Sequence, residues 1–339
     1  MNENELLEKV IVTTDIGSKA GSGLLAPEQA NQFIDYMFDA TVLGDQVRTI
    51  RMRSTEQEID RIGVGKRLIR AAVEAVDTGE NQGVFFSKIS LTTKKLRLDW
   101  ELSVESLEDN LEGEALEDHI ARLMATQAGM DLEELAINGD TTLTDPTLGI
   151  FDGWRKRALE GTVDGAAHII DHEGGPMNRL AANRALKAMP RAYMQRRNQL
   201  KFFLGSNLIQ DYLYSIVEDQ ANPAYADTSG RIVPEGRAGF TAGTLFGVPY
   251  QEVPLFNETL DYEGVLPTGP DAPTAQDDFA ELWLTFPQNL LWGVKREIKV
   301  VREYAAKKDT IEYTMFCRVG TQVENTGAFV IVQNIRVGA

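Results

Sequence analysis

The chain of 339 residues is long enough for two ordinary domains or one extended subunit, and its 43% hydrophobic residues can supply a sizeable core. It carries 34 Lys and Arg against 51 Asp and Glu, a formal net charge of −17. Proteins that grip DNA or an anionic membrane need a cationic footprint, and none stands out in this composition, so direct nucleic-acid binding is disfavoured.

The termini and the cysteine count narrow the class further. Residues 1–10 are acidic and lack the basic start and apolar run of a signal peptide. No stretch approaches the roughly 20 apolar residues of a membrane helix, so we expect a soluble protein made in the cytoplasm without a membrane partner. The single cysteine, Cys317, excludes an intrachain disulfide, and its apolar neighbours predict a small buried side chain.

The first third of the chain predicts an arm and a projecting ribbon. Residues 16–23 are too rich in Gly and Ser to pack regularly, so residues 1–24 are expected to form an arm, and Pro27 then opens an amphipathic helix. A strand over 45–54 and a clearly alternating strand over 96–104 are joined by polar, Gly-punctuated residues. This pattern predicts a long two-stranded projection, which needs neighbours to be stable.

A long helix is predicted over residues 114–138, ended by the Asn138-Gly139 pair. Polar residues intrude on its expected apolar side, and a helix that lies across subunit boundaries could satisfy them. The apolar side consists of Leu116, Ile120, Leu123 and Met124, and the intruding residues are Gln127, Asp131 and Glu134.

The rest of the chain predicts an α+β fold. The middle, 145–295, combines a helix over 178–189 broken at Pro190, a strand over 201–204 and a helix over 207–218. The last segment alternates like successive strands, over 298–303, 310–318 and 328–333.

Enzyme chemistry finds little support in these residues. The residues His168, Asp171 and His172 have a spacing that could bind a metal on a helix, so a soluble metal-dependent enzyme stays open as an alternative. A solvated loop is expected instead, because Gly174 follows at once. The Gly65-Lys66 pair lacks the earlier glycine and the following hydroxyl of a phosphate-binding loop. No nucleophile elbow is present and Cys317 has no partner signature, so neither a catalytic role nor a cofactor is predicted.

Several blocks in order and spacing resemble the tailed-phage major capsid proteins with the Hong Kong 97 fold. The resemblance runs from about residue 20 to 335, and its most specific block is the helix end at 135–140 with 148–150 just after it. The other blocks are residues 21–27, 85–88, 189–206, 244–250 and 328–331.

The resemblance implies an axial domain, a peripheral domain carrying a spine helix, an extended loop (E-loop) hairpin and an N-terminal arm. The expected division is 1–44 for the arm and first helix, 45–104 for the extended loop, 105–144 for the spine helix, 145–295 for the axial domain and 296–339 for the closing peripheral strands. It implies a structural protein that self-assembles into hexamers and pentamers of an icosahedral virion head. The head would be built in the host bacterial cytoplasm and would enclose double-stranded DNA without sequence-specific binding.

The same resemblance implies several partners, and it requires a decision on a covalent crosslink that some family members form. Expected partners are other copies of the chain, a separate scaffolding protein, a portal and a decoration protein. Some family members crosslink an extended-loop Lys to a peripheral Asn, but Gly79 lies near the expected Lys position and residues 307–310 contain no Asn, so no crosslink is predicted. An encapsulin-type nanocompartment shell, which shares the fold, remains the nearest alternative.

The extended loop would then be held by noncovalent contacts. Lys66, Arg67 and Arg70 form a basic cluster in the predicted loop. We hypothesise that they make inter-subunit contacts with acidic residues of a neighbouring copy, each contributing little alone.

Overall fold

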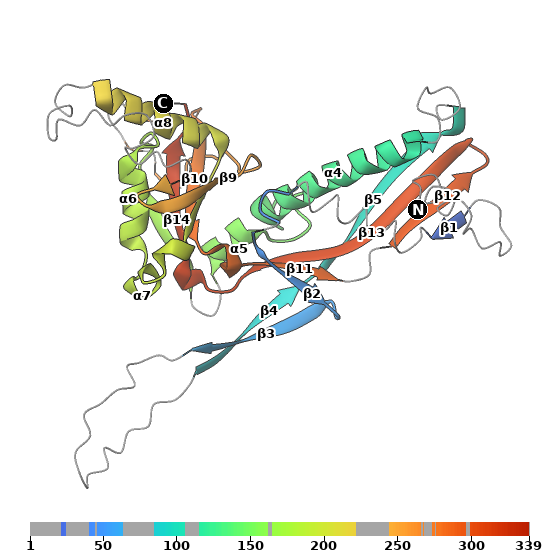
Figure 1. Ribbon diagram of the computed structural model, residues 1–339, viewed down its shortest axis with the longest axis horizontal. Helices are drawn as coiled ribbons and strands as arrows, with labels where there is room; N and C mark the ends of the chain where they lie inside the picture. The colour runs from blue at the N-terminus through green and yellow to red at the C-terminus, as the bar shows by residue number, and fades with distance from the viewer. Residues whose placement is uncertain are drawn as a thin grey trace, which may run out of the picture.

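Two six-stranded sheets and a projecting hairpin make up the mixed helix-and-strand architecture of the protein (Figure 1). A long helix lies along one sheet, and three helices surround the other. None of the helices in the described part of the chain is long and apolar enough to cross a membrane. The computed structural model describes residues 22–24, 41–44, 46–63, 85–105, 115–161, 165–221, 244–265, 267, 273–274, 276–295 and 299–338.

The first sheet is organised by its longest strand, β13 (Thr310–Val323). Its early residues alternate between buried and half-buried, because one face of the sheet is covered while the other is open. From Val319 onward every residue is buried. The strand order is β1 (Ser22–Leu24), β12 (Lys299–Ala305), β13, β11 (Leu290–Lys295) and β2 (Arg48–Met52), and β5 (Lys94–Ser103) also pairs with β13. The expected strands around 45–54, 96–104, 298–303 and 310–318 are thereby confirmed.

Helix α4 (Ala115–Asn138) runs beside this sheet and confirms the predicted helix and its end. The helix stops where Gly139 approaches the carbonyl oxygens of Leu135 and Phe151, since a Cβ there would lie 2.4 and 2.5 Å from them. The expected apolar side is wrong in detail, because Leu123 is 57% exposed. The buried side is built instead from small and apolar residues further along, namely Ala125, Ala128, Leu132, Leu135 and Ala136.

The second sheet has a buried centre flanked by helices. All seven residues of β10 (Phe279–Thr285) are buried, as expected of a central strand covered on both faces. The order is β6 (His168–Asp171), β14 (Val330–Arg336), β10, β7 (Lys201–Leu204), β9 (Val248–Glu252) and β8 (Thr244–Leu245). Its helices are α6 (Arg179–Ala188), α7 (Arg191–Met194) and α8 (Ser206–Ala221), whereas α5 (Trp154–Glu160) contacts α4 and β13.

The predicted helix over 178–189 begins where Asn178 caps it. The Asn178 side chain accepts hydrogen bonds from the backbone N–H groups of Leu180 and Ala181, at 2.9 and 3.2 Å. Three alanines, Ala181, Ala182 and Ala185, face the sheet and are fully buried. The strand over 201–204 and the helix over 207–218 are likewise confirmed.

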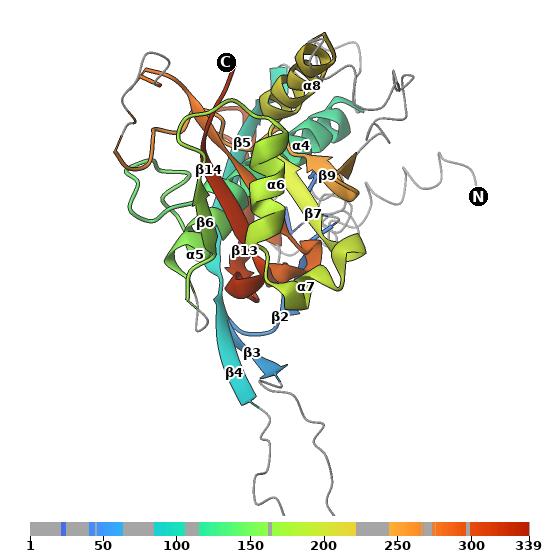
Figure 2. The same ribbon diagram turned by 90° about the vertical axis from the view of Figure 1, so that its left-hand side faces the viewer.

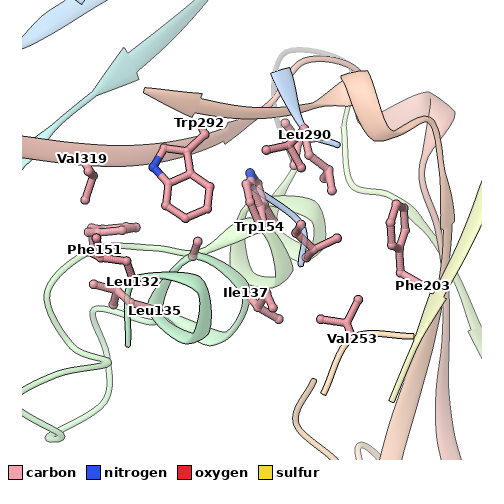
Figure 3. Packing of buried hydrophobic residues seen from close by; sticks show 14 of the residues in the cluster. Leu132, Leu135, Ile137, Phe151, Trp154, Phe203, Val253, Leu290, Trp292 and Val319 are labelled. Atoms are coloured by element: carbon pink, nitrogen blue, oxygen red, sulfur yellow. The ribbon is translucent and has the colours of Figure 1, made fainter. Parts of the chain in front are cut away.

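A single hydrophobic cluster joins the two sheets (Figure 3). Trp154 lies at its centre, with its ring edge-on to Trp292 of β11 at 5.6 Å and its Nε1 donating to the Leu291 carbonyl at 3.1 Å. From the second sheet, Trp283 and Phe329 belong to the same cluster. The two sheets are therefore packed on one core.

A two-stranded pair, β3 (Glu56–Gly63) with β4 (Phe85–Thr92), extends away from both sheets (Figure 2), but its limbs are not the two strands from which the ribbon was predicted. Its limbs lie between the strands expected at 45–54 and 96–104. Those two strands belong to the first sheet as β2 and β5.

Two sequence expectations differ from the structure. Residues 22–24 form a regular strand, β1, paired with β12, because backbone hydrogen bonds at a sheet edge do not require large side chains. Strand β14, of the expected 296–339 unit, pairs with β10 and β6 of the second sheet, while β11, of the expected 145–295 unit, lies in the first sheet. The remaining domain boundaries stay a prediction, and the helix expected from Pro27 lies outside the described residues.

Candidate assembly surfaces

The β3–β4 hairpin buries Ile89 and Leu91 near the body of the subunit and leaves its outer part without such cover. Phe86 of β4 is 73% exposed, a large apolar side chain left in solvent. The Lys88–Glu58 ion pair, 2.6 Å across the two strands, joins side chains that are both more than half exposed, so it contributes little to stability. The hairpin therefore offers a surface for another molecule rather than a folded unit by itself.

The base of the hairpin is fixed to β13. Arg318 Nη1 donates to Thr55 Oγ1 at 2.8 Å, and Gln322 Nε2 donates to the Ser90 carbonyl at 3.0 Å. Arg61 Nη1 donates to the Glu324 carbonyl at 3.2 Å. These contacts, from residues more than 200 positions apart, set the direction in which the hairpin leaves the body.

Gly320 lies under this junction, and we expect Gly320→Ala to disturb it. A Cβ at this position would lie 2.1 Å from the Thr92 carbonyl oxygen, a backbone atom that cannot turn aside. The substitution should cost about 1–3 kcal/mol in urea unfolding and make the hairpin more sensitive to protease. Gly327→Ala is the control, because the nearest atom there is a side-chain oxygen of Asn325 at 3.2 Å. Equal behaviour of the two variants would contradict the role of the close approach.

A buried carboxylate on α4 holds the chain that leads into β2. Glu133 is 1% exposed, and its two oxygens accept the backbone N–H groups of Val42 and Leu43 at 2.9 and 2.7 Å. Burial raises the pKa of Glu133, and the two backbone hydrogen bonds oppose that rise. Sequence reasoning missed this residue, because a glutamate within a helix gives no local sign that its partners lie 90 residues earlier.

The outer side of α4 is left without cover in the single subunit. Leu123 is 57% exposed, and Met130, seven residues later and so on the same side, is 40% exposed. Between them, Gln127 Nε2 donates to Asp131 Oδ1 at 2.7 Å, so two of the predicted intruding polar residues satisfy each other. This strip is a second surface that a neighbouring copy could cover.

The predicted inter-subunit residues Lys66, Arg67 and Arg70 lie outside the described residues, so their contacts stay a prediction.

The candidate metal segment is rearranged by the fold. His168 and Asp171 stand on strand β6 rather than on a helix, and His172, expected in a solvated loop, is 4% exposed. Burial lowers the pKa of His172, and its Nε2 lies 3.1 Å from the Pro176 carbonyl oxygen. In the described part of the chain, no group of three potential ligands is placed to hold a metal ion.

Cys317 is buried in β13, as its neighbours predict. Burial raises the pKa of its thiol to about 11. A nucleophilic cysteine needs a lowered pKa, so this residue is a core side chain.

No family model matches the sequence. One curated relative, “Putative prophage capsid protein YqbE” of Bacillus subtilis (strain 168), is 28% identical over 302 residues and 88% of each chain. Among solved structures, the satellite phage P4 procapsid with its size determination protein has a TM-score of 0.56 at 14% identity, covering 91% of this chain and 99% of that one.

Two further structures share the fold. The capsid of a native GTA particle matches with a TM-score of 0.58 at 14% identity, over 87% of this chain and 90% of that one. Microbacterium phage Oxtober96 matches with a TM-score of 0.52 at 14% identity, over 86% and 90%. The resemblance drawn from the sequence is thereby confirmed: the chain is similar in sequence to a prophage capsid protein and shares the fold of solved phage capsid structures.

Proposed function

We propose that this chain is the major capsid protein of a tailed bacterial virus, and that its copies form the hexamers and pentamers of an icosahedral head around double-stranded DNA. The carrying observation is the β3–β4 hairpin, a projection whose outer part leaves Phe86 exposed. Such a ribbon gains stability only against other protein, and a shell supplies that protein in every copy.

The proposal assigns the elements to the parts that the resemblance implies. In this proposal α4 is the spine helix of a peripheral domain built on the first sheet, and the second sheet with its helices is the axial domain near the capsomer centre. The hairpin is the extended loop, and β1 with the residues before it forms the arm. The exposed strip of Leu123 and Met130 on α4 supports this assignment, since it gives the peripheral domain an uncovered side.

Other partners follow from the same proposal. A separate scaffolding protein, a portal and a decoration protein would act on the assembled head, which would form in the host bacterial cytoplasm. The chain would have no catalytic role of its own. An encapsulin-type shell would instead hold a cargo enzyme, so the contents of purified particles, nuclease-protected DNA or a protein cargo, separate the two functions.

The first experiment is electron microscopy of the purified chain, beside light scattering for particle mass. Closed shells, or isolated rings of five and six copies, would support the proposal. A compact monomer in the presence of a scaffolding protein would contradict it.

Charge reversal in the predicted loop cluster tests the role of the extended loop. We expect Lys66→Glu with Arg67→Glu to weaken assembly while the circular dichroism and melting of the free subunit stay unchanged, because the two cations are proposed to meet acidic residues of a neighbour. Lys66→Arg with Arg67→Lys, which keeps both charges, is the matched control. Normal particles from the reversed variant would remove this contact from the proposal.

A further inference from the structure

One segment of this acidic chain is strongly basic. Residues 174–210 contain seven Lys and Arg and no Asp or Glu, whereas residues 211–281 contain thirteen acids and two arginines. Because the two segments have opposite charge, the basic residues of 174–210 are not apparent from the composition of the whole chain. The expectation that the chain carries no cationic footprint is wrong for this segment.

The basic segment contains α6 and α7, which lie on the second sheet. The three buried alanines of α6 face the sheet, so its cations lie toward solvent. Lys187, Arg191 and Arg196 are exposed, and none of the three has an ion pair within the described residues.

The short helix η1 (Arg197–Gln199) contacts β9 and so lies at the β9–β8 end of the sheet. Arg197 donates to the Phe246 carbonyl in the turn between β8 and β9, the last two strands of the sheet order. We call Arg191, Arg196 and Arg197, in α7 and at η1, the basic edge; Lys187 is not included, because α6 packs on β6, β14 and β10. One exposed acid, Glu252 at the end of β9, belongs to the same end of the sheet.

The other end of the sheet, at β6, is acidic. The Asn334 side chain joins two acidic segments by hydrogen bonds. Its Nδ2 donates to Asp171 Oδ1 at 2.9 Å and to the Glu263 carbonyl at 2.8 Å, and its Oδ1 accepts from the Glu263 N–H at 2.8 Å. These bonds bring the loop that contains Asp261 and Glu263 beside β6. We call Asp171, Glu173, Asp261 and Glu263 the acidic edge. All four are exposed, and Glu263 also pairs with Arg155 of the same subunit at 2.9 Å.

The two edges lie at opposite ends of one sheet. The order β6-β14-β10-β7-β9-β8 places β6 first and the β9–β8 pair last. Figure 2 shows the same separation, with β6 on the left of the domain and α7 and β9 on the right. A ring of identical copies requires this arrangement, because each copy must present two different and complementary surfaces to its two neighbours.

We propose that the basic edge of one copy docks against the acidic edge of the next, head to tail around each capsomer ring. This inference rests on the proposed function and names the residues of one ring contact. Arginine and carboxylate groups form strong bidentate pairs, and the match steers copies that otherwise repel each other through a net charge of −17. Packaged DNA would also attract the basic edge, but DNA would not account for a complementary acidic edge at the opposite end of the sheet.

Two charge-reversed variants test the contact. Arg191→Glu with Arg196→Glu gives a subunit with two acidic edges, and Glu173→Lys with Asp261→Lys gives one with two basic edges. Each variant alone should lose ring formation by at least about tenfold at matched concentration, because like charges then face each other. The chosen side chains make no ion pair in the described structure, so circular dichroism and melting should match the wild type.

Mixing the two variants provides the decisive measurement. Alternating copies again bring opposite charges together, and only a ring with an even number of copies can alternate throughout. Electron microscopy should therefore show six-membered rings restored and five-membered rings absent. The controls Arg191→Lys with Arg196→Lys, and Glu173→Asp with Asp261→Glu, keep the charges and should assemble as the wild type does.

The remaining outcomes overturn the inference. If each reversed variant forms rings normally, or if the folded mixture stays dissociated, the edges are not the ring contact. If the Arg191 and Arg196 variant forms normal shells that retain less DNA, the basic edge binds nucleic acid instead. Failure of the wild type to form rings would overturn the proposed function as well, which separates the two failures.

Discussion

Glu281→Ala is expected to destabilise the protein by about 3–5 kcal/mol, because it removes the buried partner of Arg155 and leaves that partly buried cation with only the exposed Glu263. Glu281 is 2% exposed in the central strand β10. Its Oε1 accepts from Arg155 Nε and Nη2 at 3.0 and 2.8 Å and from Gln333 Nε2 at 3.2 Å, and its Oε2 accepts from Trp283 Nε1 at 3.0 Å. Equilibrium urea unfolding followed by tryptophan fluorescence measures the loss.

Glu263→Ala is the matched control for this experiment. Glu263 also contacts Arg155, at 2.9 Å, but its side chain is 52% exposed, so its removal should cost no more than about 1 kcal/mol. Comparable losses in the two variants would show that the burial of Glu281 does not determine the effect.

Glu133→Ala is expected to cost about 2–4 kcal/mol, because it removes a charged acceptor and leaves the backbone N–H groups of Val42 and Leu43 without a partner. Burial raises the pKa of Glu133 above its ordinary 4.5, so the folded state binds the proton more tightly than the unfolded state. The wild-type carboxyl therefore contributes most below that ordinary value and loses this contribution as the pH rises through the raised pKa. The penalty of the substitution should be greater near pH 4.5 than at neutral pH.

Glu134→Ala on the same helix turn is the control, since Glu134 is only half-buried. It should unfold with nearly the wild-type free energy at both pH values. A penalty for Glu133→Ala that grows from acid to neutral pH would contradict the stated direction of its pKa.

Local periodicity explains which elements could be predicted from the sequence. The alternation of Leu96, Leu98 and Trp100 defines β5, and the Asn138-Gly139 pair defines the end of α4. In each case the signal lies within a few residues of the structure that it predicts. The limbs of the hairpin were not predicted, because the residues of β3 and of the first half of β4 lack the apolar alternation that marks the strands on either side of them.

The features that escaped prediction depend on residues far apart in the sequence. Nothing near Glu133 or Glu281 indicates that these acids are buried, because their partners lie 90 and 126 positions away. The pairing of β14 with β6 and β10 is another such case, since an apolar strand fits either sheet equally well. The basic edge was concealed differently, because adding up charges over the whole chain removes the contrast between neighbouring segments.

The shared core has a consequence for how a shell of these subunits could change size. Trp154 and Trp292 on one side, and Trp283 and Phe329 on the other, belong to one cluster, so neither sheet can loosen without exposing the apolar side chains of both. The body of the subunit is therefore cooperative and stiff. In the proposed shell, a change of particle size would therefore come from movement between whole subunits rather than from movement of one sheet against the other.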